Sequence, residues 1–480
     1  MLLLCVPPIL VLLLLLSLTL LFIRSRGKER RDHNGDASSF YPPPVPGLNY
    51  FTILKTASSG RLPQTMMQWA NDCGSSVFCM RTALNGTRTI VVGDAEVLRK
   101  VLTNKTATKP EEVYRRSKTV HNGGSSLFSE NGERWYHARK SIMYAFSPRH
   151  IRRMRDVTML KLEGFVANLD ARQGKGFDVG KEMIYLTLQI ICDAAFEYKM
   201  SASEQEEFLT ELELVLKENR NSPIPLRWRL GRFIPKVRRS RLGSKRLYKL
   251  GERMFTSYLE LENPIKGTVM DCIVNDPKYT SDKERINDMI ILLLAGHDTT
   301  AYSLAWTLKE LAKNPEEQSN LHANLLVTPK EERNNLKALH NVIKEGLRLH
   351  PVAALGGIRT CTQDIVAENY TKDGKSLVIP KGSRIFLSTM LTLHNPDYFV
   401  NPDTFIPSRW ENPSDKAVSA YLPFLTGPRN CLGQSLAYAE MRTVLSRLCA
   451  EYEFSIENEG TSTFFMTYKP INCILSAKKL

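Results

Sequence analysis

A long apolar helical pattern near the middle of the chain constrains the fold most. Residues 285–313 repeat apolar side chains at helical spacing, and the stretch from Met289 to Ala295 is apolar on nearly all sides. A helix of this kind must bury its whole circumference, so we expect it to cross the core. About 29 residues correspond to a helix roughly 43 Å long. The pattern ends at Asn314-Pro315, because proline cannot continue a helix.

Polar residues interrupt the middle of this helix, where the chain reads Ala-Gly-His-Asp-Thr-Thr from Ala295 to Thr300. Asp and Thr side chains compete with the helical hydrogen bonds, and Gly296 leaves room for a ligand. One alternative is a pair of threonines bonded back to carbonyl groups of a bent helix. That alternative suits isolated threonines better than Asp298, Thr299 and Thr300 together in so apolar a helix.

A single cysteine follows in the run Phe424-Leu-Thr-Gly-Pro-Arg-Asn-Cys431-Leu-Gly433. Apolar residues at three- and four-residue steps after it predict a helix, whose N-terminus favours a thiolate. Gly427 and Gly433 let the backbone approach a flat ligand closely, and Arg429 supplies a fixed cation. The alternative is a buried free cysteine before an ordinary helix, which is the usual environment of this residue.

Three further patterns place charged and aromatic residues on shared helix faces or near strands. Glu345 and Arg348 lie three residues apart on a helix predicted over 339–349, and Arg409 follows in Phe405-Ile-Pro-Ser-Arg-Trp410. Trp135 and Arg139 lie four residues apart on a second predicted helix. Arg359 ends the run Gly356-Gly-Ile-Arg, where a surface charge at a strand end is an equally good interpretation.

Together these motifs resemble, in order along the chain, those of the cytochrome P-450 family. The resemblance covers about residue 40 to the C-terminus. It implies that Cys431 is the axial thiolate ligand of a heme iron, an arrangement that favours O–O cleavage. It also implies that Thr299 and Asp298 manage proton delivery, while His297 is not an iron ligand. The remaining heme contacts implied by the resemblance are Trp135, Arg139, Ala295, Gly296, Arg359, Phe424, Gly427, Arg429 and Gly433.

Within that set, the resemblance implies that Trp135, Arg139, Arg359 and Arg429 bind the heme propionates. Arginine suits carboxylates because its guanidinium binds them in two places. Glu345, Arg348 and Arg409 correspond to a structural ion-pair triad that locks the cysteine loop. The fatty-acid ω-hydroxylase branch often has Glu, able to bond heme covalently, where this chain has Ala295. The cofactor is therefore expected to be heme b, held non-covalently.

We expect a mainly α fold with small β regions, the cytochrome P-450 fold, over residues 48–480. The region between about 150 and 350 reads as helices. Short strands are predicted over 378–387, around a turn at Pro380 to Gly382, and over 464–475. The 480 residues show no linker, repeat or low-complexity stretch after about residue 50, which favours one large domain.

The first 23 residues are apolar and uncharged, long enough to span a bilayer core. Basic residues follow at once, so we expect a single transmembrane helix with the catalytic domain in the cytosol. A cleaved signal peptide is the alternative, but it would carry a basic start and a small-residue cleavage site. Residues 24–47 are predicted to be a basic and proline-rich linker. The endoplasmic reticulum membrane is the expected location.

The chain is basic, with 65 Lys and Arg against 50 Asp and Glu, giving a formal charge of +15. Such an excess suggests acidic partners or an anionic membrane surface, and no nucleic-acid signature accompanies it. Nine scattered cysteines without close pairs favour a reducing compartment. The first basic cluster is expected to contact an electron donor and consists of Arg139, Lys140, Arg149, Arg152, Arg153 and Arg155. The second basic cluster is expected to contact the membrane lipid and consists of Arg227, Arg229, Arg232, Lys236, Arg238, Arg239 and Arg241.

The resemblance implies a monooxygenase that inserts one atom of O₂ into an apolar small molecule. Electrons would come from NADPH through NADPH-cytochrome P-450 reductase, with cytochrome b5 as a second donor. Sterols, fatty acids, isoprenoids and xenobiotics all fit an apolar pocket. Two alternatives stay open: a P-450-like hydroperoxide isomerase or dehydratase that needs no electron donor, and a non-catalytic membrane protein that binds heme or lipid.

Overall fold

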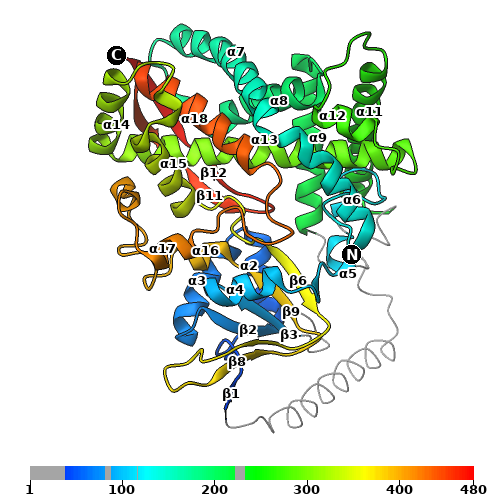
Figure 1. Ribbon diagram of the computed structural model, residues 1–480, viewed down its shortest axis with the longest axis vertical. Helices are drawn as coiled ribbons and strands as arrows, with labels where there is room; N and C mark the ends of the chain where they lie inside the picture. Colours follow the sequence, from blue (N-terminus) through cyan, green and yellow to red (C-terminus); the bar gives the residue numbers. More distant parts are fainter. Residues whose placement is uncertain (1–37, 82–87, 116, 222–232) are drawn as a thin grey trace, which may run out of the picture.

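The computed structural model describes residues 38–81, 88–115, 117–221 and 233–480. A single helix, α13 (Asp282–Lys313), crosses the helical part of the molecule, as Figure 1 shows. Around it pack α8 (Val179–Phe196), α11 (Pro235–Leu259), α15 (Lys337–Leu349) and α18 (Gln434–Glu451). The predicted core-crossing helix is thus present, and it begins three residues before the predicted start.

The ends of α13 follow from its sequence. The Ser281 side chain accepts a hydrogen bond from the backbone of Glu284, and acidic residues occupy the first turn, where the helix dipole favours negative charge. At the other end Asn314 caps the helix before Pro315. Between these ends, the N-terminal half belongs to one hydrophobic cluster and the C-terminal half to another. The polar run from Ala295 to Thr300 therefore lies where the two clusters meet.

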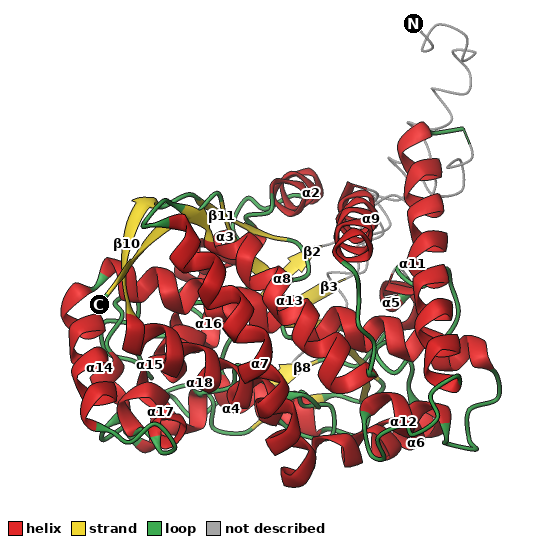
Figure 2. Cartoon of the chain, turned by 90° about the horizontal axis from the view of Figure 1, so that it is seen from above, coloured by secondary structure: helices red, strands yellow, loops and turns green. Residues whose placement is uncertain are grey.

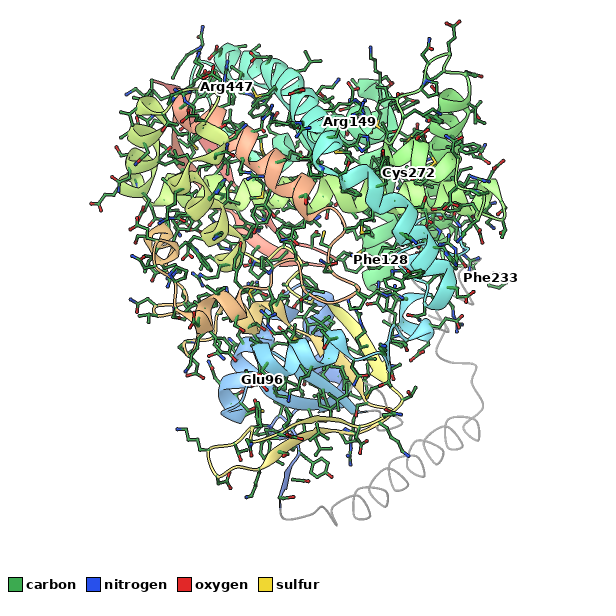
Figure 3. The ribbon with its side chains drawn as sticks, viewed as in Figure 1. Glu96, Phe128, Arg149, Phe233, Cys272 and Arg447 are labelled. Carbon is green, nitrogen blue, oxygen red and sulfur yellow. The ribbon has the colours of Figure 1, made fainter. Side chains whose placement is uncertain are left out.

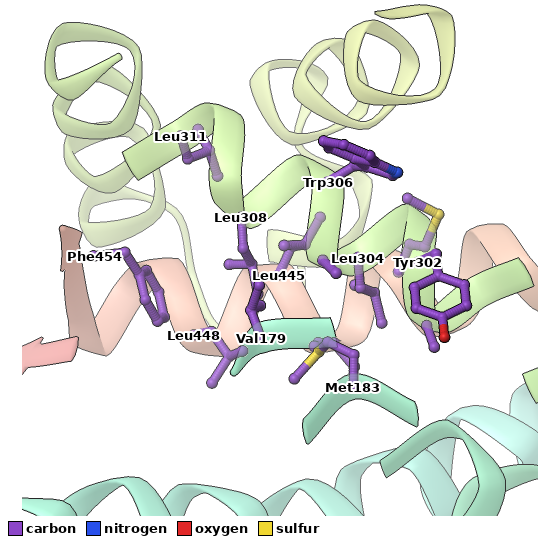
Figure 4. Close-up of a cluster of buried hydrophobic side chains, with 14 of the residues drawn as sticks. Val179, Met183, Tyr302, Leu304, Trp306, Leu308, Leu311, Leu445, Leu448 and Phe454 are labelled. Carbon is purple, nitrogen blue, oxygen red and sulfur yellow. The ribbon is translucent and has the colours of Figure 1, made fainter. Parts of the chain in front are cut away.

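Figure 4 shows the second of these clusters, in which Leu304, Leu308 and Leu311 of α13 pack beside Leu445 and Leu448 of α18. The other helices surround this core. The longer ones are α2 (Tyr50–Ser59), α3 (Leu62–Cys73), α4 (Ala95–Thr103), α6 (Gly132–Met143), α7 (Pro148–Arg172), α9 (Ala202–Asn221) and α14 (Pro315–Val327). The short ones are α5 (Glu111–Tyr114), α12 (Val269–Val274), α16 (Thr389–Leu393), α17 (Asp415–Ala420) and the 3-10 turns η1 (Ser117–Thr119), η2 (Tyr144–Phe146), η4 (Arg333–Asn335) and η5 (Pro407–Trp410).

Within the described residues, the strands form four small sheets. The largest has the order β2-β3-β9-β6-β4 and is antiparallel except between β3 and β9. Its strands are β2 (Val77–Arg81), β3 (Arg88–Val92), β4 (Ala107–Thr108), β6 (Gly357–Cys361) and β9 (Arg384–Leu387). A second sheet has the order β1 (Ser39–Phe40), β8 (Ser376–Ile379), β7 (Ile365–Ala367). A third has the order β10 (Tyr452–Asn458), β13 (Ile474–Lys479), β5 (Phe177–Asp178). In the fourth, β11 (Thr461–Phe464) pairs with β12 (Tyr468–Ile471).

The strands predicted around Pro380 to Gly382 are present as β8 and β9. They belong to different sheets, since β8 pairs with β7 and β9 pairs with β6 and β3. The two β regions expected from the sequence are too few, because the described strands form four sheets. The mainly helical fold with small sheets is confirmed.

The N-terminal predictions meet the structure only in part. Residues 1–23 lie outside the described residues, as do Arg227, Arg229 and Arg232 of the second basic cluster. Among the described helices, none combines the length and the apolarity needed to cross a membrane. The end of the predicted linker is attached to the folded domain, because Ser39 and Phe40 pair with β8 and Val45 is buried. The domain boundaries at 23 and 47 stay predictions.

Candidate functional site

The cysteine loop rests on two other elements through glycines. Gly427 has a φ of +75°, and a Cβ there would lie 2.7 Å from the carbonyl oxygen of Leu102 in α4. At the other contact, a Cβ on Gly356 would lie 2.6 Å from the Leu425 side chain. Only glycine fits both positions without a shift, so the loop is seated between α4 and the start of β6. The backbone N–H of Cys431 closes the loop by donating to the carbonyl of Phe424 at 3.0 Å.

Cys431 itself is exposed, although protein atoms surround its sulfur closely. Burial raises the pKa of the Cys431 thiol, while the Gly433 N–H and the Arg139 guanidinium act to lower it. The sequence argument attributed the thiolate to the following helix, but α18 begins only at Gln434. In this chain alone burial outweighs the stabilising groups, and a coordinated metal is what deprotonates such a thiol outright. A Cβ at Gly433 would contact only Phe146, at 3.9 Å.

Three cations gather beside this loop, and we refer to Lys109, Arg359 and Arg429 as the cation cluster. The Arg429 guanidinium stacks over the Trp135 ring at 3.7 Å and donates to the Asn131 side chain at 3.0 Å. Burial and the positive charge of Arg359 lower the pKa of Arg429 to about 10. Burial together with Arg359 and Arg429 also lowers the pKa of Lys109 well below its ordinary value. Arg359 is only 3% exposed, which rules out the surface charge considered from the sequence.

Within the described part of the chain, the cation cluster has no carboxylate partner. Among the residues that the structure describes, no carboxylate forms an ion pair with Lys109, Arg359 or Arg429, and Arg429 Nη1 is buried without a hydrogen-bond partner. The nearby carboxylate of Glu130 is bonded to Lys118 instead, at 3.1 Å. Buried cations are normally paired, so this arrangement fits an acidic ligand. Heme carries two carboxylates, and the residues present therefore match the cofactor that the sequence implies.

Arg139 lies outside the cation cluster and is hydrogen-bonded to the cysteine loop. It donates through Nη1 to the backbone carbonyl of Asn430 at 2.9 Å and through Nη2 to the Asn430 side chain. Its guanidinium therefore braces the cysteine loop from α6. The propionate contact that the resemblance implies for Arg139 stays a prediction; its hydrogen bonds in the structure go to the loop that carries Cys431.

In the polar run of α13, both threonine hydroxyls are hydrogen-bonded to backbone carbonyls of the same helix. Thr299 Oγ1 donates to the carbonyl of Ala295 at 2.9 Å, and Thr300 Oγ1 donates to that of Gly296 at 3.1 Å. Back-bonding, the alternative weighed from the sequence, is thus real in this structure. Ala295 is exposed, between buried Leu294 and half-buried Gly296, so its side chain is not covered by the surrounding helices. The space beside Gly296 was predicted to hold a ligand. In the structure the Ile191 side chain fills it, 2.9 Å from where a Cβ on Gly296 would lie.

Asp298 and His297 point to different partners. The Asp298 carboxylate accepts a hydrogen bond from Thr467 Oγ1 at 2.7 Å. His297 is fully buried, donates from Nδ1 to the carbonyl of Leu293 at 2.7 Å, and packs edge-on against Phe208. Its Nε2 is buried without a partner, and burial lowers the pKa of the ring. His297 is therefore neither solvent-facing nor fully hydrogen-bonded.

A second group, the ion-pair network of Glu345, Arg348, Arg409 and Trp410, is completely satisfied. The Glu345 carboxylate accepts from Arg348 at 2.8 and 3.0 Å, from Arg409 at 2.9 Å, from Trp410 Nε1 at 2.9 Å and from the backbone of Ile406 at 3.0 Å. Glu345 and Arg348 are both 0% exposed. The remaining Arg348 donors reach the carbonyls of Leu393, Pro402 and Thr404. The network joins α15 to the segment before the cysteine loop.

Aromatic residues connect this network to the cysteine loop itself. The Trp410 ring contacts Tyr421 edge-on, with 4.7 Å between ring centroids. The Tyr421 and Tyr438 hydroxyls lie 3.1 Å apart, and the Tyr438 ring lies 5.2 Å from that of Phe424. Sequence reasoning missed Tyr421 and Tyr438, although Trp410 directly after Arg409 was a usable signal. It also missed Lys109, Asn131 and Thr467, for which no local pattern exists.

Comparison with known proteins decides the family. The cytochrome P-450 family model matches residues 42–472, which is most of the chain. The chain belongs to the cytochrome P-450 family. It is 28% identical to cytochrome P-450 4c21 of Blattella germanica over 74% of this chain and 77% of that protein. It is 26% identical to the mitochondrial sterol 26-hydroxylase of Rattus norvegicus over 78% of this chain and 76% of that protein.

A solved structure shares the fold. The crystal structure of the cytochrome P-450DA heme domain superposes with a TM-score of 0.79, at 21% identity, over 92% of this chain and 98% of that one. Family and fold together make this protein a cytochrome P-450 monooxygenase with a heme iron and a cysteine thiolate ligand. Members of the family generally need a redox partner and bind apolar substrates.

Proposed function

We propose that this P-450 monooxygenase is anchored in the endoplasmic reticulum membrane and oxidises an apolar lipid or xenobiotic. It takes electrons from NADPH through NADPH-cytochrome P-450 reductase, with cytochrome b5 as a second donor. The substrate classes are those of the sequence analysis: sterol, fatty acid, isoprenoid or xenobiotic. A relative named a sterol 26-hydroxylase supports the first of these. The single observation that carries the proposal is a cysteine loop packed beside one buried and two half-buried cations that have no carboxylate partner among the described residues.

Each site residue has a proposed task. Cys431 holds the iron of heme b, which supplies the O₂ chemistry once bound. Arg429, Arg359 and Lys109 neutralise the heme carboxylates, and Trp135 fixes the plane of the Arg429 guanidinium. Phe424, Gly427 and Gly433 shape the loop around Cys431, and Arg139 braces it.

On the other side of the site, Ala295 is proposed to leave the middle of α13 open to the cofactor and substrate, while Gly296 makes room for the Ile191 side chain. Asp298 holds a proton on its carboxylate and exchanges it with water, and Thr299 passes it on through Oγ1. For that task Thr299 must release the carbonyl of Ala295, to which it donates at 2.9 Å. Such helical back-bonds are weak enough to exchange.

The electron donor is proposed to dock on the exposed basic side chains of α6 and α7. Lys140, Arg149, Arg152 and Arg155 are exposed, and Figure 3 shows Arg149 on α7. On α6, Lys140 directly follows Arg139, whose guanidinium holds the cysteine loop. The charged surface and the proposed iron ligand are therefore separated by little more than one helix. Complementary charge steers an acidic partner to such a surface.

The membrane assignment rests on residues 1–23 as an anchor and 24–47 as a linker to the catalytic domain, residues 48–480. Two exposed aromatic residues support contact between that domain and lipid: Phe51 of α2 is 72% exposed and Phe233, just before α11, is 70% exposed. Figure 2 shows α2 and the start of α11 at the same edge of the molecule. Aromatic side chains near basic ones suit the bilayer interface.

Reconstitution of the full chain with reductase and NADPH tests the proposed function. A library of apolar lipids is first screened for the spectral shift caused by loss of iron-bound water. Compounds that give the shift are expected to be oxygenated only when NADPH and reductase are present. Conversion of a lipid hydroperoxide without NADPH would instead favour the isomerase or dehydratase alternative. Absence of NADPH consumption with every binding lipid would favour a non-catalytic role.

A further inference from the structure

The C-terminal hairpin of β11 and β12 reaches the acid of the α13 motif. Thr467 lies in the turn between the two strands, is only 8% exposed, and donates from Oγ1 to Asp298 Oδ2 at 2.7 Å. Within the described part of the chain, this is the one hydrogen bond formed by the Asp298 carboxylate, and no ion pair accompanies it. The partly exposed carboxylate therefore has one oxygen held by protein and the other open to water.

The hairpin is fixed firmly enough to position a side chain. The backbone of Tyr468 donates to the carbonyl of Val352 at 2.8 Å and accepts from Trp306 Nε1 at 3.0 Å. On the opposite strand, Phe464 donates to the carbonyl of Gly60 at 2.7 Å. Trp306 lies two turns beyond Asp298 on α13, so the helix grips the hairpin at two points on nearly the same face. A hydroxyl on this turn is therefore held at a constant place relative to Asp298.

The other hydroxyls of the motif do not supply this contact. Thr299, Thr300 and Ser303 each donate to a carbonyl one turn earlier in α13. A neighbouring ring, Tyr302, lies under the Lys469 ammonium, 5.3 Å from its nitrogen. The orientation of the Asp298 carboxylate thus depends on a residue 169 positions away in the sequence.

We propose that Thr467 is a positioning residue for proton delivery, holding Asp298 so that its free oxygen faces water. This inference rests on the proposed role of Asp298. The Thr467 hydroxyl can donate to Oδ2 of the ionised carboxylate, and it can donate to the same oxygen when the proton sits on Oδ1, because Oδ2 keeps its acceptor lone pairs. Thr467 therefore keeps the carboxyl group in one orientation in both protonation states, while the proton enters and leaves through the other oxygen.

The test compares Thr467→Val, which keeps the shape and removes the hydroxyl, with Thr467→Ser, which keeps the hydroxyl. The heme-loaded full chain is assayed with reductase for product and hydrogen peroxide formed per NADPH. Thr467→Val is expected to lower product per NADPH by about fivefold, since one hydrogen bond of this kind contributes about that factor. Thr467→Ser is expected to stay near the parent value. The matched control is Thr461→Val, an exposed threonine of the same hairpin.

A double-variant cycle separates positioning from packing. In an Asp298→Asn background, Thr467→Val is expected to add less than about twofold to the loss, because the residue it positions no longer carries a proton. The same two substitutions are followed by thermal unfolding, where non-additive midpoint shifts are expected from direct contact. That second readout does not depend on turnover.

Three results would overturn the inference: equal loss of coupling in Thr467→Val and Thr467→Ser, an unchanged product yield in Thr467→Val, or additive effects with Asp298→Asn. Each of these leaves the parent enzyme active. A parent enzyme that oxygenates nothing with NADPH and reductase contradicts the proposed function instead, so the two failures are distinguishable.

Discussion

Two groups of buried charges flank the cysteine loop, and they are built in opposite ways. In the ion-pair network, one carboxylate receives five hydrogen bonds and every neighbouring arginine has partners. In the cation cluster, three positive charges gather without a carboxylate among the described residues, and Arg429 keeps an unpartnered buried N–H. A completed group of charges can hold the fold together by itself. An incomplete one gains its missing partner from a ligand, so the difference separates scaffold from binding site.

Removing the centre of the ion-pair network is expected to have the largest effect. Glu345→Ala leaves two arginines and the Trp410 N–H without their acceptor, which costs about 3–5 kcal/mol in unfolding free energy. We expect loss of heme retention, measured as heme per polypeptide, together with a lower thermal midpoint. The control Glu96→Gln alters an exposed pair on α4, labelled in Figure 3, and is expected to change stability by no more than about 0.5 kcal/mol. Full heme content in Glu345→Ala would show that the network is dispensable.

The glycines of the cysteine loop come next. Gly427→Ala places a Cβ in the left-handed region and 2.7 Å from the Leu102 carbonyl oxygen, a strain of about 1–3 kcal/mol. Heme content and thermal midpoint are expected to fall. Gly433→Ala is the matched comparison, because its Cβ would contact only Phe146 at 3.9 Å. If Gly433→Ala lowered the thermal midpoint as much as Gly427→Ala, the backbone argument for the loop would be wrong.

For the cation cluster, removing a cation is expected to stabilise the protein without heme and to weaken the binding of heme. Lys109→Met removes a cation whose pKa is lowered by burial, Arg359 and Arg429. In heme-free protein the unfolded chain binds more protons than the folded one below the ordinary lysine pKa, so this group destabilises the fold increasingly as pH falls. Lys109→Met is therefore expected to stabilise the heme-free protein near neutral pH and to weaken heme retention. Urea unfolding and heme transfer measure the two effects.

The comparison of parent and Lys109→Met across pH sharpens this prediction. The stability difference in heme-free protein is expected to shrink as pH rises toward the ordinary lysine pKa of about 10.4. A Lys109→Met protein less stable than the parent without heme would contradict the view that the cation cluster lacks an anion.

The smallest expected effect concerns the aromatic connection between the two groups. Tyr421→Phe removes the hydrogen bond to Tyr438, which packs against Phe424. Loss of one such bond costs about 1 kcal/mol. We expect a small drop in thermal midpoint and faster conversion of the carbon monoxide complex to its inactive form. Wild-type behaviour in both measurements would mean that the cysteine loop is held by α4, α6 and β6 alone.

The sequence was most informative where the interaction was local. Glu345 and Arg348 on one helix face, the core-crossing α13 and the loop around Cys431 follow from spacing and from the family motifs. Contacts between distant segments carried no such signal. Lys109 joins Arg359 and Arg429, Leu425 sits over Gly356, and Thr467 bonds to Asp298, each across a long stretch of chain. The occupant of the space at Gly296 was assigned incorrectly, because it depends on packing between elements. The propionate contact of Arg139 stays a prediction beside its hydrogen bonds to Asn430.

The account stands on Cys431 as the thiolate ligand of a heme iron. The most direct measurement is the absorption spectrum of the reduced full-length protein under carbon monoxide, with Cys431→Ser prepared in parallel. We expect the red-shifted Soret band of a thiolate-ligated heme in the parent protein and its absence in the serine variant. A parent protein without this band after growth with ample heme precursor, or a serine variant that retains it, would contradict the assignment.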